Sequence, residues 1–471
     1  MSEQSIANIP PNVDLIVAGG GLAGHCAALA AAEQGASVLL LEKREIYGGS
    51  TVHSSGSFAF AGTQAQRDAG IDDSPEKIVQ DIVSASGGLA DPALVDLYIT
   101  HQADTYGWLK QQGVDFHPVS LSSNQGVPRT HPTDPWQLMR ALHARVEQNE
   151  RITYLDQAAI RELDVSSAGR VEGARIEHQG KEYLVKARCG VVLATGGFSR
   201  NTELIAKFTP HLKPALKLGG AGNTGDGLLL AWKLGADLLD MAYVNGTFGI
   251  SLNNYPDTRI DDSDEPLLRL AIYRGAIIVN LDAQRFADES VSYKKLGEMC
   301  LGQDQAIGFQ VWDQNIMDLS VPVPNSTNFQ LAYEKGLVKS ADTLEALAAT
   351  VGLDPQRFAE TVRRYNADVK EGGRDTQFGR TSLGKGYGKL APLERAPFYI
   401  YPCTTAVLST YCGLRVDPSM RVVDVAGKPL DGLFAAGEIV GGFHGAGYMS
   451  GSSLSKAAIF GRVAAATALR A

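Results

Sequence analysis

Three glycines near the N-terminus have the spacing GxGxxG, which is suited to binding a dinucleotide. Gly19, Gly21 and Gly24 follow an apolar run that reads as a strand and open an Ala-rich stretch that reads as a helix. Glycines let the backbone approach a pyrophosphate, and the helix N-terminus offers N–H groups and a positive dipole end. Glu42, followed by Lys43, ends the next apolar run, where a carboxylate can bind a ribose. A Gly-rich turn without a ligand is the alternative.

A second Gly- and Ser-rich segment directly after Glu42 favours FAD over NAD. GGST at 48–51 and HSSGSFAFAG at 53–62 supply small residues and N–H donors where an extended cofactor would run towards its flavin. LATGG at 193–197 and GLFAAGE at 432–438 are apolar runs that end in small residues. Three distant segments fit one long ligand. The cofactor contacts expected from them are Gly49, Ser50, Thr51, Ser55, Gly56, Thr195, Gly196, Gly197 and Gly437.

Several motifs together resemble the fumarate reductase/succinate dehydrogenase flavoprotein superfamily. They are GGGLAG, GGST, LATGGFSRN, NTGDG at 223–227, QRFADE at 284–289 and GLFAAGEIVGGFHGAG at 432–447, and they span nearly the whole chain. The resemblance implies an FAD-binding domain interrupted by a mobile cap, with the substrate between the cap and the flavin. It also implies flavin contacts by Asp226, Glu438, Ser453 and Leu454. For Asp226 a helix cap is the alternative.

The same resemblance bears on how the flavin is attached. Succinate dehydrogenase attaches FAD through a histidine in the Gly-rich segment, and that position is Ser50 here. His53, three residues later, reads as a loop or packing residue. We therefore expect non-covalent FAD.

Two tyrosines occupy places where fumarate reductases have arginines. Tyr293 takes the place of the arginine that delivers a proton, and Tyr448 replaces a carboxylate-binding arginine beyond His444. A planar guanidinium matches a carboxylate, whereas a neutral phenol hydrogen-bonds a ketone oxygen. Thr247 and Phe248 stand near the place of a substrate histidine, which also argues against a small dicarboxylate. The replacements predict a substrate with a carbonyl group.

Tyrosines at these two places resemble the 3-ketosteroid dehydrogenases of the same superfamily, which remove hydrogen from the carbon pair next to a ketone. By that resemblance Tyr448, with the backbone N–H of Ser452, polarises the carbonyl and stabilises the enolate. Tyr293 acts as the base, flavin N5 accepts the hydride, and Ser450 joins a hydrogen-bond relay. His444 is as suited to positioning its loop as to touching substrate. The alternatives are a half-buried cap aromatic for Tyr293 and a packed loop aromatic for Tyr448.

A tyrosine base needs its pKa, about 10 when unperturbed, lowered towards the working pH. Lys294 and Lys295 are adjacent to Tyr293, and Arg274 lies on an expected neighbouring strand, so any of them could favour the phenolate. The sequence does not distinguish between them. Arg129 resembles part of a substrate-entry loop, where it could hold an acidic substituent or lie solvated.

Composition limits the partners. The chain has 471 residues, a net charge of -9 and a pI near 5.6, which argues against a phosphate-backbone partner such as nucleic acid. Five scattered cysteines lack CxxC spacing, so we expect no metal site, haem or disulfide framework and a cytoplasmic location. No apolar run is long enough to span a membrane. Without an iron–sulfur or haem motif, an external electron acceptor is expected.

The elements that would position these residues predict an α/β fold. Helical patterns near 136–148 and 223–234 alternate with apolar runs such as GVVLAT, and a last helix covers roughly 453–470. Polar stretches at 241–270 and 366–393 read as loops or hinges. We expect a Rossmann-like FAD-binding domain with an inserted α+β capping domain. The expected bounds are 1–249 and 394–471 for the first and 250–393 for the second.

The function predicted from these residues is an FAD-dependent dehydrogenase that introduces an α,β C=C bond next to a ketone. The substrate would be a 3-ketosteroid or a smaller alicyclic ketone. A fumarate-reductase-like enone or enoate reductase, running the same step backwards, is the second possibility. A subunit in which FAD is structural and the chain mainly binds partners is the third.

Overall fold

The structure is a computed structural model that describes residues 9–258, 266–322, 326–384 and 387–470. Its chain divides into two compact units. The first comprises Met1–Thr209, Leu218–Val244 and Ser409–Ala471, and the second comprises Pro210–Lys217 and Asn245–Leu408. The capping domain expected at 250–393 was defined by its function, and its bounds stay a prediction.

An eight-stranded, largely parallel sheet forms the centre of the first unit, with the path β17-β18-β8-β1-β2-β5. β1, β2, β5, β8 and β18 run parallel, while β7 and β6 continue from β8 as an antiparallel extension and β17 pairs antiparallel with β18. The strands are β1 (Asn12–Ala18), β2 (Val38–Leu41), β5 (Ile152–Leu155), β6 (Ala158–Val165), β7 (Val171–His178), β8 (Lys181–Leu193), β17 (Arg421–Val423) and β18 (Pro429–Ala435).

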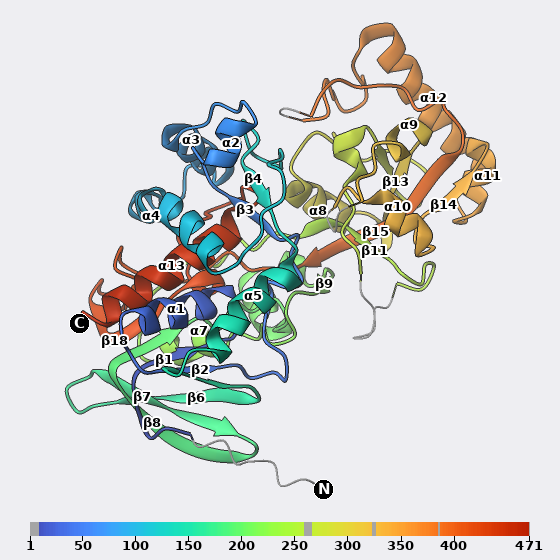
Figure 1. The fold of residues 1–471 in the computed structure, drawn as a ribbon. Coiled ribbons are helices and arrows are strands. Elements are labelled where there is room, and N and C mark those ends of the chain that lie inside the picture. The colour runs from blue at the N-terminus through green and yellow to red at the C-terminus, as the bar shows by residue number, and fades with distance from the viewer. Residues whose placement is uncertain (1–8, 259–265, 323–325, 385–386, 471) are drawn as a thin grey trace, which may run out of the picture. The chain divides into compact units, whose positions relative to one another are not determined.

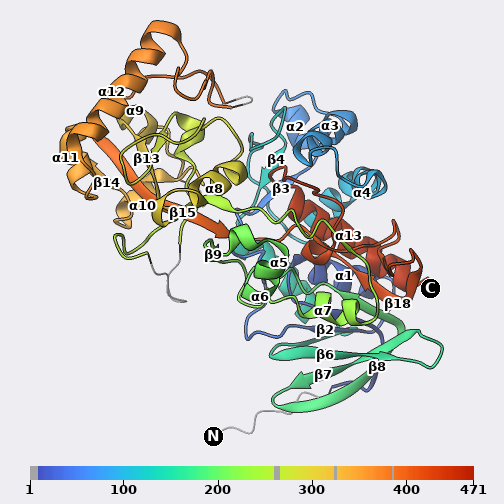
Figure 2. The same ribbon diagram turned by 180° about the vertical axis from the view of Figure 1, so that it is seen from behind.

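Helices from both ends of the chain cover this sheet. α1 (Leu22–Glu33) and α13 (Ser452–Ala468) lie side by side, blue and red in Figure 1 and again adjacent in Figure 2. α1 is apolar on every side because β1, α5 and α13 all pack against it. The other helices of this unit are α2 (Gln64–Asp68), α3 (Pro75–Ala85), α4 (Pro92–Gln111), α5 (Pro135–Glu147), α6 (Thr202–Phe208), α7 (Asp226–Lys233) and the short η4 (Gly437–Ile439).

Two small antiparallel pairs complete the first unit. They are β3 (Ser57–Ala59) with β4 (Thr130–Pro132), and β10 (Leu238–Leu239) with β16 (Gly413–Leu414). The N-terminus of α13 packs against β3, because Ser455 Oγ accepts the N–H of Ala59 at 2.9 Å. This contact joins the last helix to the segment that follows the GGST loop.

The second unit is built on a six-stranded sheet in which β15 is central. β11, β13 and β14 pair antiparallel with β15, β12 pairs with β13, and β9 runs parallel to β15. The strands are β9 (Leu216–Lys217), β11 (Thr247–Ser251), β12 (Ile277–Val279), β13 (Gly308–Trp312), β14 (Lys339–Ala341) and β15 (Phe398–Val407). Every residue of β15 is buried.

Helical segments accompany that sheet, and together they form a large hydrophobic core that is rich in aromatic side chains. Buried aromatics of this core include Phe309, Trp312 and Tyr401. The helical segments are η1 (Pro210–Leu212), η2 (Ala271–Arg274), α8 (Tyr293–Leu301), η3 (Asp304–Ala306), α9 (Gln314–Met317), α10 (Phe329–Glu334), α11 (Leu344–Ala349) and α12 (Pro355–Gly372). A parallel βαβ core and an antiparallel sheet with helices together confirm the predicted α/β class.

Three expectations about local structure were wrong. The polar stretch at 241–270 contains the buried strand β11, and part of 366–393 belongs to α12, whose buried residues recur at helical spacing. Arg274 ends the 3-10 helix η2 instead of lying on a strand. Residues 259–265 and 385–386 of those stretches lie outside the described residues. Across the part of the chain that is described, no helix is long and apolar enough to cross a membrane.

Candidate active site

The GxGxxG turn joins β1 to α1, and its three glycines differ in the room that they leave for a side chain. A Cβ on Gly19, whose φ is +119°, would lie 2.2 Å from the carbonyl oxygen of Ala194. A Cβ on Gly24 would lie 1.8 Å from the carbonyl oxygen of Gly19. These two glycines therefore allow close backbone packing. A Cβ on Gly21 would meet nothing nearer than 3.8 Å beyond its chain neighbours.

The loop after β2 lies beside Gly21. A Cβ on Gly49 would have the Cα of Gly21 as its nearest neighbour, at 3.9 Å. The N–H of Leu22, in the first turn of α1, donates to Thr51 Oγ1 at 3.3 Å. First-turn N–H groups lack partners within the helix and form the positive end of its dipole. The turn therefore fits a diphosphate group.

Glu42 is buried at the end of β2 and bound to the glycine turn. Its Oε2 accepts the N–H of Gly20 at 3.0 Å, and its Oε1 accepts the N–H of Arg44 at 2.8 Å. Burial raises the pKa of this carboxyl above its usual range, while the two backbone bonds oppose that shift. Each carboxylate oxygen can accept a further bond, so a ribose contact is compatible with this geometry.

Lys43 and Asp226 bind one another. Lys43 Nζ lies 2.7 Å from Asp226 Oδ2 and 2.5 Å from Thr224 Oγ1. Asp226 is the first residue of α7, whose N-cap is Gly225, so it is not the cap residue considered above. The ion pair joins the end of β2 to the start of α7.

A polar cluster brings Ser50 and Glu438 together through Asn223. The Asn223 amide donates to Ser50 Oγ at 3.0 Å and to both carboxylate oxygens of Glu438 at 3.1 Å. The N–H of Thr410 donates to Glu438 Oε1 at 2.9 Å. A Cβ on Gly197 would lie 2.0 Å from Thr410 Oγ1, so this position has no room for a side chain. The sequence predicted Ser50, Gly197 and Glu438 but not Asn223, although NTGDG was a visible motif, nor Thr410.

Two buried polar atoms of this region have no partner within the described residues. They are Thr195 Oγ1 and Asn223 Oδ1. A Cβ on Gly196 would lie 3.5 Å from Asn223 Oδ1. Unpaired buried polar atoms are costly in a native structure unless a ligand or water satisfies them. Together with the glycine turn at α1, the Thr195 hydroxyl and the Asn223 amide oxygen fit the polar groups of a large cofactor such as FAD.

The remaining residues expected at the cofactor lie around the same elements. Thr51 is buried in the GGST loop, and Ser55 is exposed and 3.1 Å from Ser57 Oγ. A Cβ on Gly56 would lie 2.1 Å from the carbonyl oxygen of Thr133, so Gly56 is a packing position. Gly437 packs similarly against α1, and His53 is exposed.

The first turn of α13 carries Ser453 and Leu454. Its N-cap, Gly451, has φ +89°, and a Cβ there would lie 2.9 Å from the backbone of Phe58 in β3. Ser453 Oγ is 3.5 Å from His444 Nε2. The predicted helix at 453–470 is confirmed as Ser452–Ala468, and its N-terminus provides the positive dipole end expected there.

Tyr448 lies in the loop before α13 and is held at several points. Its hydroxyl oxygen accepts the N–H of Gly451 at 2.9 Å. Its ring stacks on Tyr411 at 4.9 Å and meets the edge of His444 at 5.5 Å between centroids. Burial raises the pKa of Tyr448 above its ordinary value, so the phenol is neutral at physiological pH.

The two serines expected beside Tyr448 are both bound through their backbones. The N–H of Ser452 donates to the carbonyl of Met449 at 3.1 Å, so this N–H is engaged within the loop. The N–H of Ser450 donates to Ser123 O at 3.1 Å, and its carbonyl accepts from Gln125. The loop geometry thus leaves the substrate role of Ser452 unsupported, and the roles of both serines stay predictions.

Tyr293 belongs to the second unit and opens α8. Its N–H donates to the hydroxyl of Tyr273 at 2.9 Å, and its side chain is 8 % exposed. Lys294 Nζ lies 5.4 Å from the centre of the Tyr293 ring and donates to Thr247 Oγ1 at 2.6 Å. Lys294 is 4 % exposed, whereas Lys295 is exposed. Lys294 is therefore the inward lysine of the two.

Arg129 is neither solvated nor open to a substrate. Its side chain is fully buried, and NH2 lies 3.0 Å from Asp73 Oδ1 and 3.2 Å from Asp81 Oδ2. It binds two carboxylates of its own chain, which corrects both alternatives expected for it. The neighbouring His131 is also buried, with Nδ1 donating to the carbonyl of Arg129 at 2.8 Å.

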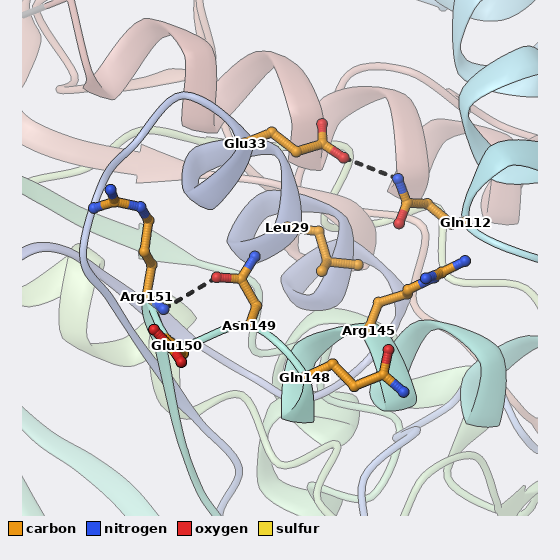
Figure 3. A pocket seen from close by; sticks show the side chains of 8 residues that line it. All are labelled: Leu29, Glu33, Gln112, Arg145, Gln148, Asn149, Glu150 and Arg151. Atoms are coloured by element: carbon orange, nitrogen blue, oxygen red, sulfur yellow. Dashed lines mark hydrogen bonds between the residues drawn. The ribbon is translucent and has the colours of Figure 1, made fainter.

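A surface groove at the C-terminal end of α1 is lined by none of these residues. Figure 3 shows Glu33 bonded to Gln112 across it, at 2.8 Å. Its lining comprises Leu29, Glu33, Gln112, Arg145, Gln148, Asn149, Glu150 and Arg151, and no residue expected at the site lines it. We assign it no part in the site.

Comparison with known proteins assigns this arrangement to a family. The FAD binding domain family matches residues 14–454. A fumarate reductase (cytochrome) of Shewanella frigidimarina is 30% identical over 475 residues, covering 98% of this chain and 78% of the relative. The open conformation of a flavocytochrome c3 fumarate reductase has a TM-score of 0.83 at 28% identity, covering 99% of this chain and 79% of that one.

A second solved structure represents the ketone branch. The 3-ketosteroid-Δ4-(5α)-dehydrogenase from Rhodococcus jostii RHA1, in complex with 4-androstene-3,17-dione, has a TM-score of 0.75 at 27% identity and covers 99% of both chains. The resemblance read from the motifs is confirmed, with both fumarate reductases and a ketosteroid dehydrogenase among the relatives. The chain therefore belongs to the FAD binding domain family, and it is an FAD-binding oxidoreductase of the fumarate reductase superfamily.

Proposed function

We propose that this protein is an FAD-dependent dehydrogenase that introduces a C=C bond α,β to the ketone of a cyclic substrate. The observation that carries the proposal is Tyr448, a half-buried neutral phenol in the loop before α13. A phenol donates to a ketone oxygen without needing a counter-charge, unlike a guanidinium. The ketosteroid dehydrogenase of known structure supports a ketone as the group that is recognised.

Tyr448 would polarise the carbonyl. The Gly451 N–H donates to the phenol oxygen, and in the proposed role the phenol O–H donates to the substrate carbonyl. Donors aimed at a developing enolate oxygen stabilise the transition state more than the ground state. His444, at the edge of the same ring, orients the loop.

Tyr293 would remove the second proton. Lys294 beside its ring supplies a positive charge that stabilises the phenolate form needed for base catalysis. Tyr293 and Tyr448 belong to different units of the chain. The role proposed for each tyrosine is therefore based only on the residues around that tyrosine.

The cofactor would bind through the elements described for the first unit. Gly21, Gly49 and the first turn of α1 would hold the diphosphate, Glu42 the ribose, and Ser50 with Asn223 the flavin end. When bound, FAD would accept the hydride that leaves the carbon next to the deprotonated one. Ser50 is not a residue that forms a covalent flavin bond, so we propose that the cofactor is non-covalent. Acid precipitation that releases all the yellow colour would agree, and colour retained in the pellet would not.

Replacing the phenol tests the dehydrogenase proposal. Tyr448→Phe should slow reduction of the flavin by a saturated cyclic ketone about 100- to 1,000-fold, since one oxyanion donor is lost. Tyr154→Phe is the matched control, because the buried Tyr154 hydroxyl has no hydrogen-bond partner among the described residues. The measurement is anaerobic stopped-flow bleaching of the flavin band. Equal rates in wild type and Tyr448→Phe would contradict the proposal.

A reductase is the second candidate, supported by the sequence relative. The Shewanella frigidimarina protein is a fumarate reductase, and the flavocytochrome c3 structure is that of another. In that direction Tyr293 would donate the proton and reduced FAD would deliver the hydride to an enone or enoate. For either direction we also propose an external electron acceptor or donor. From the cysteines we propose a cytoplasmic location.

A further inference from the structure

A short segment from another part of the first unit binds the backbone of the Tyr448 loop. Asn124 Nδ2 donates to the carbonyl of Tyr448 at 2.8 Å. Gln125 Nε2 donates to the carbonyl of Ser450 at 2.8 Å, and the N–H of Ser450 donates to the carbonyl of Ser123 at 3.1 Å. We call residues 123–125 the clamp. Three consecutive clamp residues thus bind two residues of the loop.

Gln125 is the buried centre of the clamp. Its side chain is 1 % exposed, its Oε1 accepts the N–H of Ser122 at 3.0 Å, and its Nε2 also lies 2.8 Å from Thr130 Oγ1. The Gln125 amide therefore fixes the clamp to β4 and the Tyr448 loop at once.

The clamp is itself anchored to α3. The N–H of Gly126 donates to Asp81 Oδ2 at 2.5 Å, and the same carboxylate pairs with the buried Arg129. Arg129 also pairs with Asp73, so two carboxylates hold one guanidinium away from solvent. Removing one member of such a buried ion network leaves an uncompensated buried charge, which is strongly destabilising.

Tyr448 is consequently fixed at both ends. Asn124 binds its backbone carbonyl, while the Gly451 N–H at the cap of α13 binds its hydroxyl. A hydrogen-bond donor in catalysis loses much of its effect when displaced by about 1 Å. The direction of the phenol therefore depends on the position of its backbone as well as on the cap.

We propose that Asn124 is a positioning residue that sets the direction of the Tyr448 hydroxyl through its backbone carbonyl. This inference rests on the proposed function, because it assigns Tyr448 the role of carbonyl donor. Asn124 has φ +61°, a conformation that glycine adopts without strain but that other side chains disfavour. Asn124→Gly therefore removes the amide while keeping the backbone path, which makes it a clean substitution.

The first measurement is steady-state and stopped-flow kinetics of purified, FAD-loaded variants. Asn124→Gly should lower kcat at least tenfold with KM changed less than threefold, because the donor acts mainly in the transition state. Gln179→Gly is the matched control, since Gln179 has φ +51° in the turn between β7 and β8. The melting temperatures of both variants should stay within a few degrees of wild type. Unchanged kcat in Asn124→Gly, while Tyr448→Phe is impaired, would overturn the inference and leave the proposed function intact.

A second measurement does not depend on the substrate. Hydrogen–deuterium exchange of the peptide covering 445–455 should be faster in Asn124→Gly than in wild type, because the loop loses a fixed contact. The control variant Gln179→Gly should leave that peptide unchanged. If no ketone reduces the wild-type flavin, the proposed function fails. The exchange result still shows whether Asn124 of the clamp holds the Tyr448 loop in place. Identical exchange in wild type and Asn124→Gly would refute it.

Discussion

At the scale of single residues, the sequence identified the two tyrosines and left their surroundings open. The replacement of guanidinium by phenol was visible because a neutral and a charged side chain differ in what they can bind. Which lysine faces Tyr293 was not visible, because adjacent residues at the start of a helix point in different directions. Asn124 could not be found either, since its contact with Tyr448 joins positions 324 residues apart.

The inward lysine gives a prediction about the base. Lys294→Met removes a positive charge 5.4 Å from the Tyr293 ring. At an effective dielectric constant of about 20, such a charge is worth roughly 3 kcal/mol before screening, so the rise of kcat/KM with pH should move at least about one unit to higher pH. Lys295→Met, which changes the exposed neighbour, should leave the profile in place. Coincident pH profiles for the two variants would show that Lys294 does not act on the base.

At the scale of elements, the strongest local patterns were predicted well. The helices expected at 136–148 and 453–470 are Pro135–Glu147 and Ser452–Ala468, because Pro at the first turn and a glycine cap mark their starts. The helix expected from 223 begins only at Asp226, since Gly225 has φ +82°. β11 was missed because a five-residue strand inside a polar stretch gives a weak signal, although its partner β15 buries it.

Two glycines of the same turn should behave differently when mutated. Gly24→Ala places a methyl group 1.8 Å from a backbone oxygen, so it should destabilise folding by at least about 3 kcal/mol. Gly21→Ala places one at an ordinary contact distance, 3.8 Å from its nearest neighbour, so the apoprotein should melt near the wild-type temperature. Added FAD should raise the melting temperature of wild type but not of Gly21→Ala, because a ligand stabilises only the protein that binds it. FAD-dependent stabilisation of Gly21→Ala equal to wild type would place the cofactor elsewhere.

At the scale of the whole molecule, the buried histidines link stability to pH. Burial lowers the pKa of His131 from 6.5 to about 4 and that of His25 likewise to about 4. The unfolded chain therefore binds protons that the folded protein does not between these values. Stability should be highest above the unfolded pKa and fall as the pH decreases towards 4, by about 2 kcal/mol for each histidine at pH 5.

Urea unfolding at pH 7 and pH 5 measures this linkage. His131→Gln keeps a donor for the Arg129 carbonyl and an acceptor for Thr63 but cannot take up the proton. The loss of stability between the two pH values should be smaller in this variant by about 2 kcal/mol. Carboxylates that titrate over the same interval are common to both proteins and cancel in the difference. Equal losses would mean that His131 does not contribute.

The central claim, oxidation of a cyclic ketone, is tested most directly by mixing the wild-type holoenzyme anaerobically with candidate reductants. The panel is a set of saturated cyclic ketones, 3-ketosteroids and succinate, followed by visible absorbance of the flavin. The proposal predicts that at least one ketone bleaches the flavin and yields the α,β-unsaturated product, while succinate does not. Bleaching by succinate alone, or no bleaching by any ketone while the dithionite-reduced enzyme is reoxidised by fumarate, would contradict it and favour a carboxylate reductase.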